Sequence, residues 1–167
     1  MPSSDPAEIL LTHNRWATRV LLECCASLPE EQFHQRFDIG PGSLHDTLTH
    51  ILGAMQGWGD LLGGREQRAR LEGSQRSVDQ LLQLLDVIAD DMQESVSAHP
   101  PEELVTGRRG DKTFTFTRGG VLTHVMTHGM HHRAQCLNML RRLGVSPLPP
   151  SSVVEWIMTV DAAGEGS

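Results

Sequence analysis

The sequence predicts an all-α fold: a four-helix bundle with a short β-hairpin between its third and fourth long helices, and a short C-terminal helix. Four long segments carry apolar residues at helical spacing, and a capping residue precedes each of them. Alternating Thr and Phe at 113–117 indicate one arm of a hairpin. At 167 residues, the chain is expected to form one domain, residues 1–167.

The first helix is expected to run to Ala26. Asp5 is a suitable N-cap, Pro6 suits the first turn, and Glu8 stands at the third helical position. His13 lies on the apolar face but has no histidine partner four residues away. It is therefore interpreted first as a core histidine bonded to a carbonyl or a neighbouring helix, and only second as a metal ligand. Residues 30–41 are predicted to be a polar linker.

The second helix is predicted from Leu44 to Leu62, where Gly63 and Gly64 end it. Ser43 and Asp46 have the spacing of a capping box. His50 lies within the widened apolar side of this helix. A narrow polar arc lies elsewhere on the helix and contains His45, Thr49, Gln56 and Asp60.

The third helix is predicted over 74–97, opened by Ser77 with Gln80 at the third position, and carries no ligand-type residue on its apolar stripe. The preceding arginines at 65, 68 and 70 alternate with glutamates, which favours a solvated loop of mixed charge. Arms at 103–106 and 113–117 are predicted to form the hairpin, which covers one end of the bundle.

The fourth helix is predicted to begin after Thr117 and to end at Leu143 and Gly144. A last short helix is expected over 153–158, with a capping box formed by Ser152 and Glu155.

Two histidines lie in the middle of the apolar stripe of the fourth helix. His128 and His132 are four residues apart and share a face with Val121, Val125 and other apolar residues. Imidazoles at these positions pack less well than aliphatic side chains would, and they add buried nitrogens that need hydrogen-bond or metal partners. A divalent cation satisfies both, and the spacing is that of helical zinc-binding pairs. The alternative, that the histidines only hydrogen-bond to each other, stays open.

A zinc-like centre needs at least three ligands. His50 on the facing helix is the expected third, which gives His50, His128 and His132. His124 and Cys136 each lie eight residues, about 12 Å, from one member of the pair, too far for one helix to supply three converging ligands. Zn²⁺ is the default ion, and Ni²⁺, Fe²⁺ or Mn²⁺ also accept imidazole.

Further residues are candidates for supporting roles around such an ion, although no acidic residue is an evident general base. Asp46 lies one turn before His50 and is a candidate acceptor for its second ring nitrogen. The favoured alternative is that Asp46 only caps its helix. The candidates for supporting or proton-transfer roles are His13, Asp46, His124, His131 and Arg133.

Composition limits the classes of partner. The net charge of −7 argues against nucleic acid. No apolar run reaches membrane-spanning length, and the N-terminus lacks the pattern of a signal peptide. We therefore expect a cytoplasmic protein with no membrane partner. The 3 cysteines include no CxxC pair and are expected to be free thiols.

Two stretches resemble the signatures of the DinB/YfiT-like family of small helical metalloproteins, which is unrelated to the DNA polymerase of the same name. They are residues 44–52 (LHDTLTHIL) and 120–135 (GVLTHVMTHGMHHRAQ), and residues 14–17 (NRWA) also resemble the first helix of that family. The resemblance covers about residues 7–143. Ala134 departs from the Gly that is usual after the Arg.

The resemblance implies a four-helix bundle, often dimeric, with metal ligands at His50, His128 and His132. It also implies a small-molecule substrate and, for some relatives, a low-molecular-weight thiol used by S-transferases or isomerases. The favoured hypothesis is a metal-dependent enzyme of the hydrolase or transferase type acting as a homodimer, and the resemblance favours a thiol-dependent S-transferase. The alternative is a non-catalytic stress-response or structural bundle, which a fourth protein ligand such as His13 would favour.

Overall fold

The computed structural model describes residues 3–164. Within that range the helices and strands are α1 (Pro6–Ala26), α2 (Glu30–Phe33), α3 (Leu44–Leu62), α4 (Val78–Ser97), β1 (Leu104–Arg109), β2 (Lys112–Thr117), α5 (Arg118–Arg142) and α6 (Val153–Gly164).

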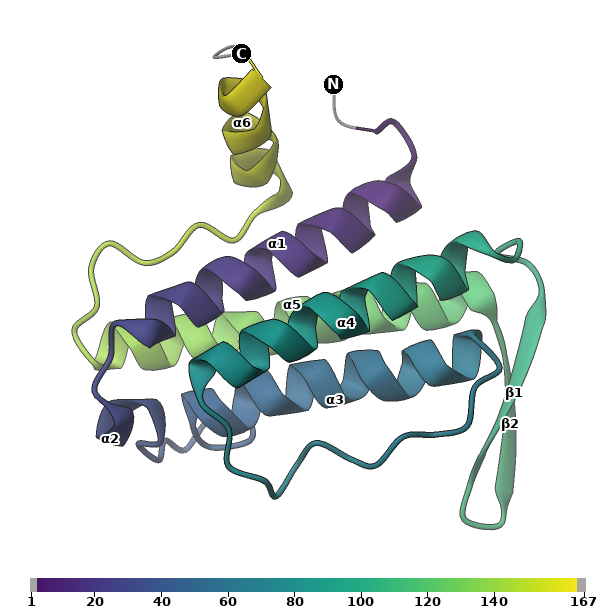
Figure 1. The fold of residues 1–167 in the computed structure, drawn as a ribbon, viewed down its shortest axis with the longest axis horizontal. Coiled ribbons are helices and arrows are strands. Elements are labelled where there is room, and N and C mark those ends of the chain that lie inside the picture. Colours follow the sequence, from purple (N-terminus) through teal and green to yellow (C-terminus); the bar gives the residue numbers. More distant parts are fainter. Residues whose placement is uncertain (1–2, 165–167) are drawn as a thin grey trace.

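The long helices α1, α3, α4 and α5 form the predicted bundle (Figure 1). α3 packs between α4 and α5, and α1 closes the other side against the same two helices. The space between them is filled by fully buried aliphatic side chains and methionines: Leu22, Leu44, Leu48, Ile51, Leu52, Leu62, Leu81, Leu85, Ile88, Met92, Met139 and Leu140. None of the helices among residues 3–164 combines the length and apolar character that a membrane span requires.

Most predicted helix starts are confirmed. The Asp5 carboxylate accepts a hydrogen bond from the Ala7 N–H at 2.9 Å, and Ser77 forms a full capping box with Gln80. The predicted start of α4 at residue 74 is wrong, because Ser77 has extended backbone dihedrals and the helix begins at Val78. The linker at 30–41 also contains the one-turn helix α2, which places Phe33 in the core.

Both predicted short elements are present but longer than expected. The β1 and β2 strands pair antiparallel from Leu104 opposite Thr117 to Arg109 opposite Lys112, and Gly110 makes the turn with φ +59°. α6 continues beyond 158 to Gly164, and its Ser152–Glu155 capping box is confirmed. The hairpin packs beside the C-terminal end of α3 and the start of α5.

One connection between the long helices is itself long and irregular. Residues 63–77 run back along the length of the molecule, so that α3 and α4 point the same way (Figure 1). An extended chain spans about 3.3 Å per residue and a helix rises 1.5 Å per residue, so this segment is long enough to retrace the 19 residues of α3. We call it the crossover segment.

The crossover segment buries the polar arc of α3. His45, Gln56 and Asp60 are each buried, and each bonds to the segment: to the Arg76 N–H, the Ala69 carbonyl and the Arg68 guanidinium. Arg65 also lies 3.5 Å from the Asp60 carboxylate. Residues 65–70 form the predicted exposed loop of mixed charge, and two of its arginines in addition neutralise a carboxylate that is 0% exposed.

Candidate metal centre

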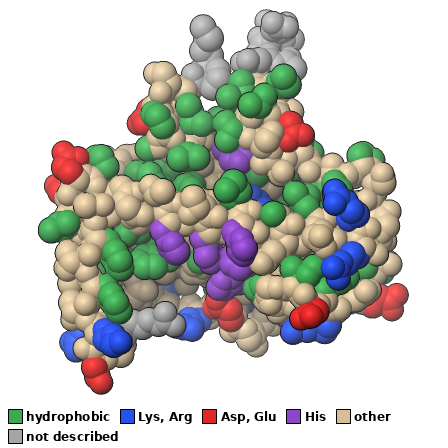
Figure 2. All heavy atoms as spheres, turned by 180° about the vertical axis from the view of Figure 1, so that it is seen from behind, with side chains coloured by type: hydrophobic (Ala, Val, Ile, Leu, Met, Phe, Trp, Pro, Cys, Tyr) green, Lys and Arg blue, Asp and Glu red, His purple; other side chains and the backbone are tan. Residues whose placement is uncertain are grey.

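Three imidazoles from two helices meet on one face of the bundle. His50 on α3 and His128 and His132 on α5 each offer a nitrogen, and these nitrogens all lie within 4.8 Å of one another. The Nε2 atoms of His50 and His128 are 3.2 Å apart, and the His128 and His132 ring centroids are 4.4 Å apart. Figure 2 shows the histidines gathered in the middle of this face. The structure thus brings together the three residues predicted from helical periodicity.

Neighbouring oxygens fix the protonation of two of the rings. The His132 Nδ1 lies 2.8 Å from the Gln135 Oε1, and the His50 Nδ1 lies 3.3 Å from the Glu72 Oε1. A carboxylate or amide oxygen can only accept, so each Nδ1 carries the proton. The Nε2 atoms of both rings are therefore free to present lone pairs to a cation.

Burial favours the neutral form of the two α5 rings, His128 and His132. Burial, together with the neighbouring imidazoles of His132 and His50, lowers the pKa of His128 to about 4. Burial also lowers the pKa of His132, partly offset by its bond to Gln135. Neutral imidazole is the form that ligates metals, and the lowered pKa values favour this form for His128 and His132 at pH 7.

A divalent ion fits this donor set. At a metal–nitrogen distance of about 2.1 Å, tetrahedral ligation separates neighbouring nitrogens by about 3.4 Å, close to the 3.2 Å between His50 and His128. Each ring is half-buried rather than sealed, so the face remains accessible to a small molecule. Within residues 3–164, this trio is the one group of three or more such side chains close enough to share an ion.

Three of the predicted supporting residues lie elsewhere. The His13 Nε2 is 3.0 Å from the Ser151 carbonyl oxygen, which confirms its interpretation as a core histidine. The Arg133 guanidinium is buried against α1, where it donates to Asn14 and Thr18. Asp46 bonds to Arg36 and to the His45 Nδ1 rather than to His50, so its predicted role beside His50 is wrong.

The other two supporting candidates lie beside the cluster. His131 accepts a hydrogen bond from the Gln135 Nε2 at 3.0 Å, so Gln135 links it to His132. His124 is exposed, and its ring lies 5.6 Å from that of His128 and 5.3 Å from that of Trp58. His131 and His124 thus surround the ligands without joining the group of three.

Sequence reasoning missed Glu72 and Gln135. Gln135 could have been found, because it lies three residues after His132 and therefore one turn along the same helix. Glu72 had no local signal, since it reaches His50 from the irregular crossover segment, 22 positions away. Its carboxylate lies over Gly53, where an added Cβ would stand 3.2 Å from the Glu72 Oε1.

Replacing Glu72 by alanine should weaken metal binding about tenfold, because the His50 ring loses the acceptor that fixes its Nδ1 proton. Loss of a hydrogen-bond partner of a metal-binding histidine usually lowers metal affinity by about 10- to 100-fold. We expect the low end of that range because Glu72 is 43% exposed. Competition with a chromophoric chelator measures the affinity. Glu66→Ala, an exposed glutamate of the same segment, is the matched control, and equal affinities for the two variants would refute this role.

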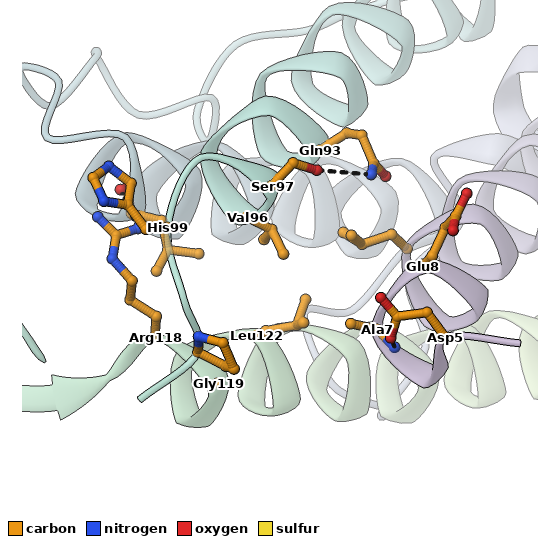
Figure 3. Close-up of a pocket in the computed structure, with 13 residues that line it drawn as sticks. Asp5, Ala7, Glu8, Gln93, Val96, Ser97, His99, Arg118, Gly119 and Leu122 are labelled. Atoms are coloured by element: carbon orange, nitrogen blue, oxygen red, sulfur yellow. Dashed lines mark hydrogen bonds between the residues drawn. The ribbon is translucent and has the colours of Figure 1, made fainter. Parts of the chain in front are cut away.

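A separate cavity of about 490 Å³ opens where the start of α1 meets the end of α4 and the start of α5 (Figure 3). Asp5 and Glu8 lie on one side of it, and His99 and Arg118 on the other. Its lining includes none of the three clustered histidines. The cavity is therefore distinct from the candidate centre. Arg118 at its edge donates hydrogen bonds to the Leu62 and Ser95 carbonyls.

Comparison with known proteins agrees with this architecture. A crystal structure of a DinB-like protein from Bacillus subtilis superposes with a TM-score of 0.62 at 14% identity, covering 86% of this chain and 96% of that one, which supports the fold. Protein DinB of B. subtilis strain 168 is 23% identical over 168 residues, 93% of this chain and 96% of the relative. The model of the DinB family matches residues 3–156. With a match over nearly its whole length, the chain belongs to the DinB family.

Proposed function

We propose that the protein binds one divalent metal ion, Zn²⁺ by default, at His50, His128 and His132, and that it is a metal-dependent transferase using a low-molecular-weight thiol. The observation that carries the proposal is the cluster of three imidazoles whose nitrogens converge on a solvent-accessible face. When bound, such an ion acts as a Lewis acid and favours the thiolate form of a bound thiol. Ni²⁺, Fe²⁺ and Mn²⁺ suit the same ligands.

The residues of the chain hold and orient this site. Glu72 and Gln135 keep the Nδ1 protons of His50 and His132 in place, which leaves Nε2 for ligation. In the proposed reaction the thiol first loses its proton to solvent. Its sulfur then forms a carbon–sulfur bond to the electrophile, while the leaving group departs with its bonding electron pair.

The cysteines of the chain are poor candidates for that nucleophile. Burial raises the pKa of the Cys136 thiol to about 12 and also raises the pKa values of Cys24 and Cys25. A thiolate is the reactive form, so these side chains stay inert at pH 7. The reacting sulfur must therefore come from a small molecule. The 3 free cysteines also support the expected placement in the cytoplasm, which stays a prediction.

Metal analysis followed by thiol titration tests the proposal. We expect the purified protein to bind one equivalent of metal, and the Co²⁺-loaded protein to gain a sulfur-to-metal charge-transfer absorption when thiols are added. Absence of stoichiometric metal would refute the site. Stoichiometric metal with no change on thiol addition would favour the alternative, a non-catalytic metal-binding stress-response or structural bundle.

We also propose that the protein is a homodimer. Four large apolar side chains on α1 and α6 are exposed, and they are Leu10, Val154, Met158 and Val160. A second copy covering them would remove this apolar area from water. Sedimentation equilibrium at micromolar concentration should give twice the mass of 18.4 kDa, and a monomer there would refute the proposal.

A further inference from the structure

A continuous row of rings connects the histidine cluster with the hairpin. From His128 the neighbouring ring is His124, followed by Trp58 at 5.3 Å from it. Phe116 lies 5.9 Å beyond Trp58 in an edge-to-face arrangement, and Phe114 lies 6.2 Å beyond Phe116. All of these separations fall in the range of favourable ring contacts. The row joins α5, α3 and β2 into one aromatic wall.

The two phenylalanines lie on the side of the hairpin that faces the bundle. Phe116 is directly opposite Val105 in the strand pairing, and Phe114 is directly opposite Gly107, so these four residues share one face. Val105 is buried, and a Cβ on Gly107 would stand 3.4 Å from Leu61 of α3. The opposite face carries Thr106 and Thr115, whose hydroxyls are 3.1 Å apart.

Both phenylalanines remain accessible although they face inward. Phe114 is 40% exposed and Phe116 39%, whereas an inward residue packed directly on a helix would be buried. Gly107 contributes to the exposure of Phe114, because it lies directly opposite and offers no cross-strand side chain to pack against. The surface is hollowed between the hairpin, at the left of Figure 2, and the histidines.

We propose that this aromatic wall binds a planar, uncharged aryl or conjugated group of the small molecule whose other end reaches the histidine cluster. Stacked and edge-to-face rings favour a flat π system over an aliphatic chain. A cationic group is disfavoured, because the proposed ion and the exposed Lys112, on the same face of β2 as the two phenylalanines, are also positive. A protein that docked on the outward face would not contact these rings, since they point toward the bundle and lie on the other side of the hairpin from Thr106 and Thr115.

The inference rests on the proposed function for the reacting end of the ligand, but the wall can be tested without metal. The probe is 4-nitrobenzyl alcohol, a neutral nitroaryl compound that quenches tryptophan on contact. A background with Trp16→Phe and Trp156→Phe leaves Trp58 as the reporter. We expect saturable quenching of Trp58 in the metal-free protein, and about tenfold weaker binding when Phe114→Ala and Phe116→Ala are combined.

Two controls separate this result from damage to the hairpin. Thr115→Ala changes the outward face of the same strand, and Val87→Ala removes an exposed apolar side chain from α4, so both should keep the affinity of the parent. Equal affinity in the double phenylalanine variant, or non-saturable quenching in all proteins, would overturn the inference. So would a change of oligomeric state in the double variant without a change in quenching, which would assign the rings to a second copy.

Metal stoichiometry, measured on the same proteins, keeps the two proposals apart. If the phenylalanine variants bind the aryl probe as well as the parent but retain one metal ion, only the aromatic wall is refuted. If the parent quenches as expected but binds no metal, the proposed metal centre fails and the aryl site stands as a binding site alone.

Discussion

Replacing His132 by alanine is expected to abolish stoichiometric binding of divalent metal, with an affinity loss of 100-fold or more. The substitution reduces the cluster to His50 and His128, and two imidazoles do not complete a zinc-like site. It removes a half-buried ring from the surface of α5, so the bundle should remain folded. Isothermal titration with Zn²⁺ and metal analysis after dialysis measure the effect. One tightly held ion in this variant would refute the site.

The choice of control follows from the structure. One candidate control is His45→Ala, which should leave the metal ligands unchanged. His45 is buried, however, where it donates to Asp46 and accepts the Arg76 N–H, so its loss would also loosen the crossover segment. His99, paired with Glu103 at 3.1 Å near the end of α4, lies outside the cluster. His99→Ala should therefore bind metal as the wild type does.

Replacing Arg68 by alanine is expected to lower the free energy of unfolding by about 3 kcal/mol, the low end for removing one partner of a buried ion pair. The Arg68 Nη2 lies 2.7 Å from the Asp60 Oδ1, and Asp60 has no exposed surface. Without this guanidinium the carboxylate stays buried with Arg65 at 3.5 Å and the Arg68 N–H as its remaining partners. Urea denaturation followed by circular dichroism measures the loss.

The acid dependence of this effect has a defined sign. Burial alone would raise the pKa of Asp60, but hydrogen bonds from Arg68 more than offset it, so its pKa lies below the ordinary 3.8. The carboxylate therefore contributes stability above that pH, and the contribution is lost as the pH falls below it. The difference in the free energy of unfolding between wild type and Arg68→Ala should therefore become smaller as the pH falls in this range. Arg70→Ala, an exposed arginine of the same segment, is the control, and a similar loss there would contradict the assignment.

The features predicted correctly from sequence were those with local periodic signals. Helix starts such as Ser77 with Gln80 were recognisable because the capping bonds span only three residues. The histidine trio was predictable because helical spacing puts His128 and His132 on one face and His50 on the apolar side of a helix that packs against it. In each case the side chains are positioned by regular structure.

Features that depend on irregular chain were not predictable in this way. The polar arc of α3 has the composition of a solvated face, yet the crossover segment covers it and supplies partners for Gln56 and Asp60. Glu72 reaches His50 by the same route. No periodic rule places a 15-residue loop, so neither the buried carboxylate nor the acceptor behind His50 could be inferred before the path of that loop was known.

The path of the crossover segment also has a consequence for the dynamics of the protein. One stretch of chain both shields Asp60 from water and holds the Nδ1 of His50, so a local opening of residues 63–77 would release both together. The coupling is reciprocal: if closure of residues 63–77 increases the affinity of His50 for a metal ion, then binding of that ion must stabilise the closed segment by the same factor. Backbone amides there should consequently exchange with deuterated solvent more slowly whenever the imidazoles are ligated.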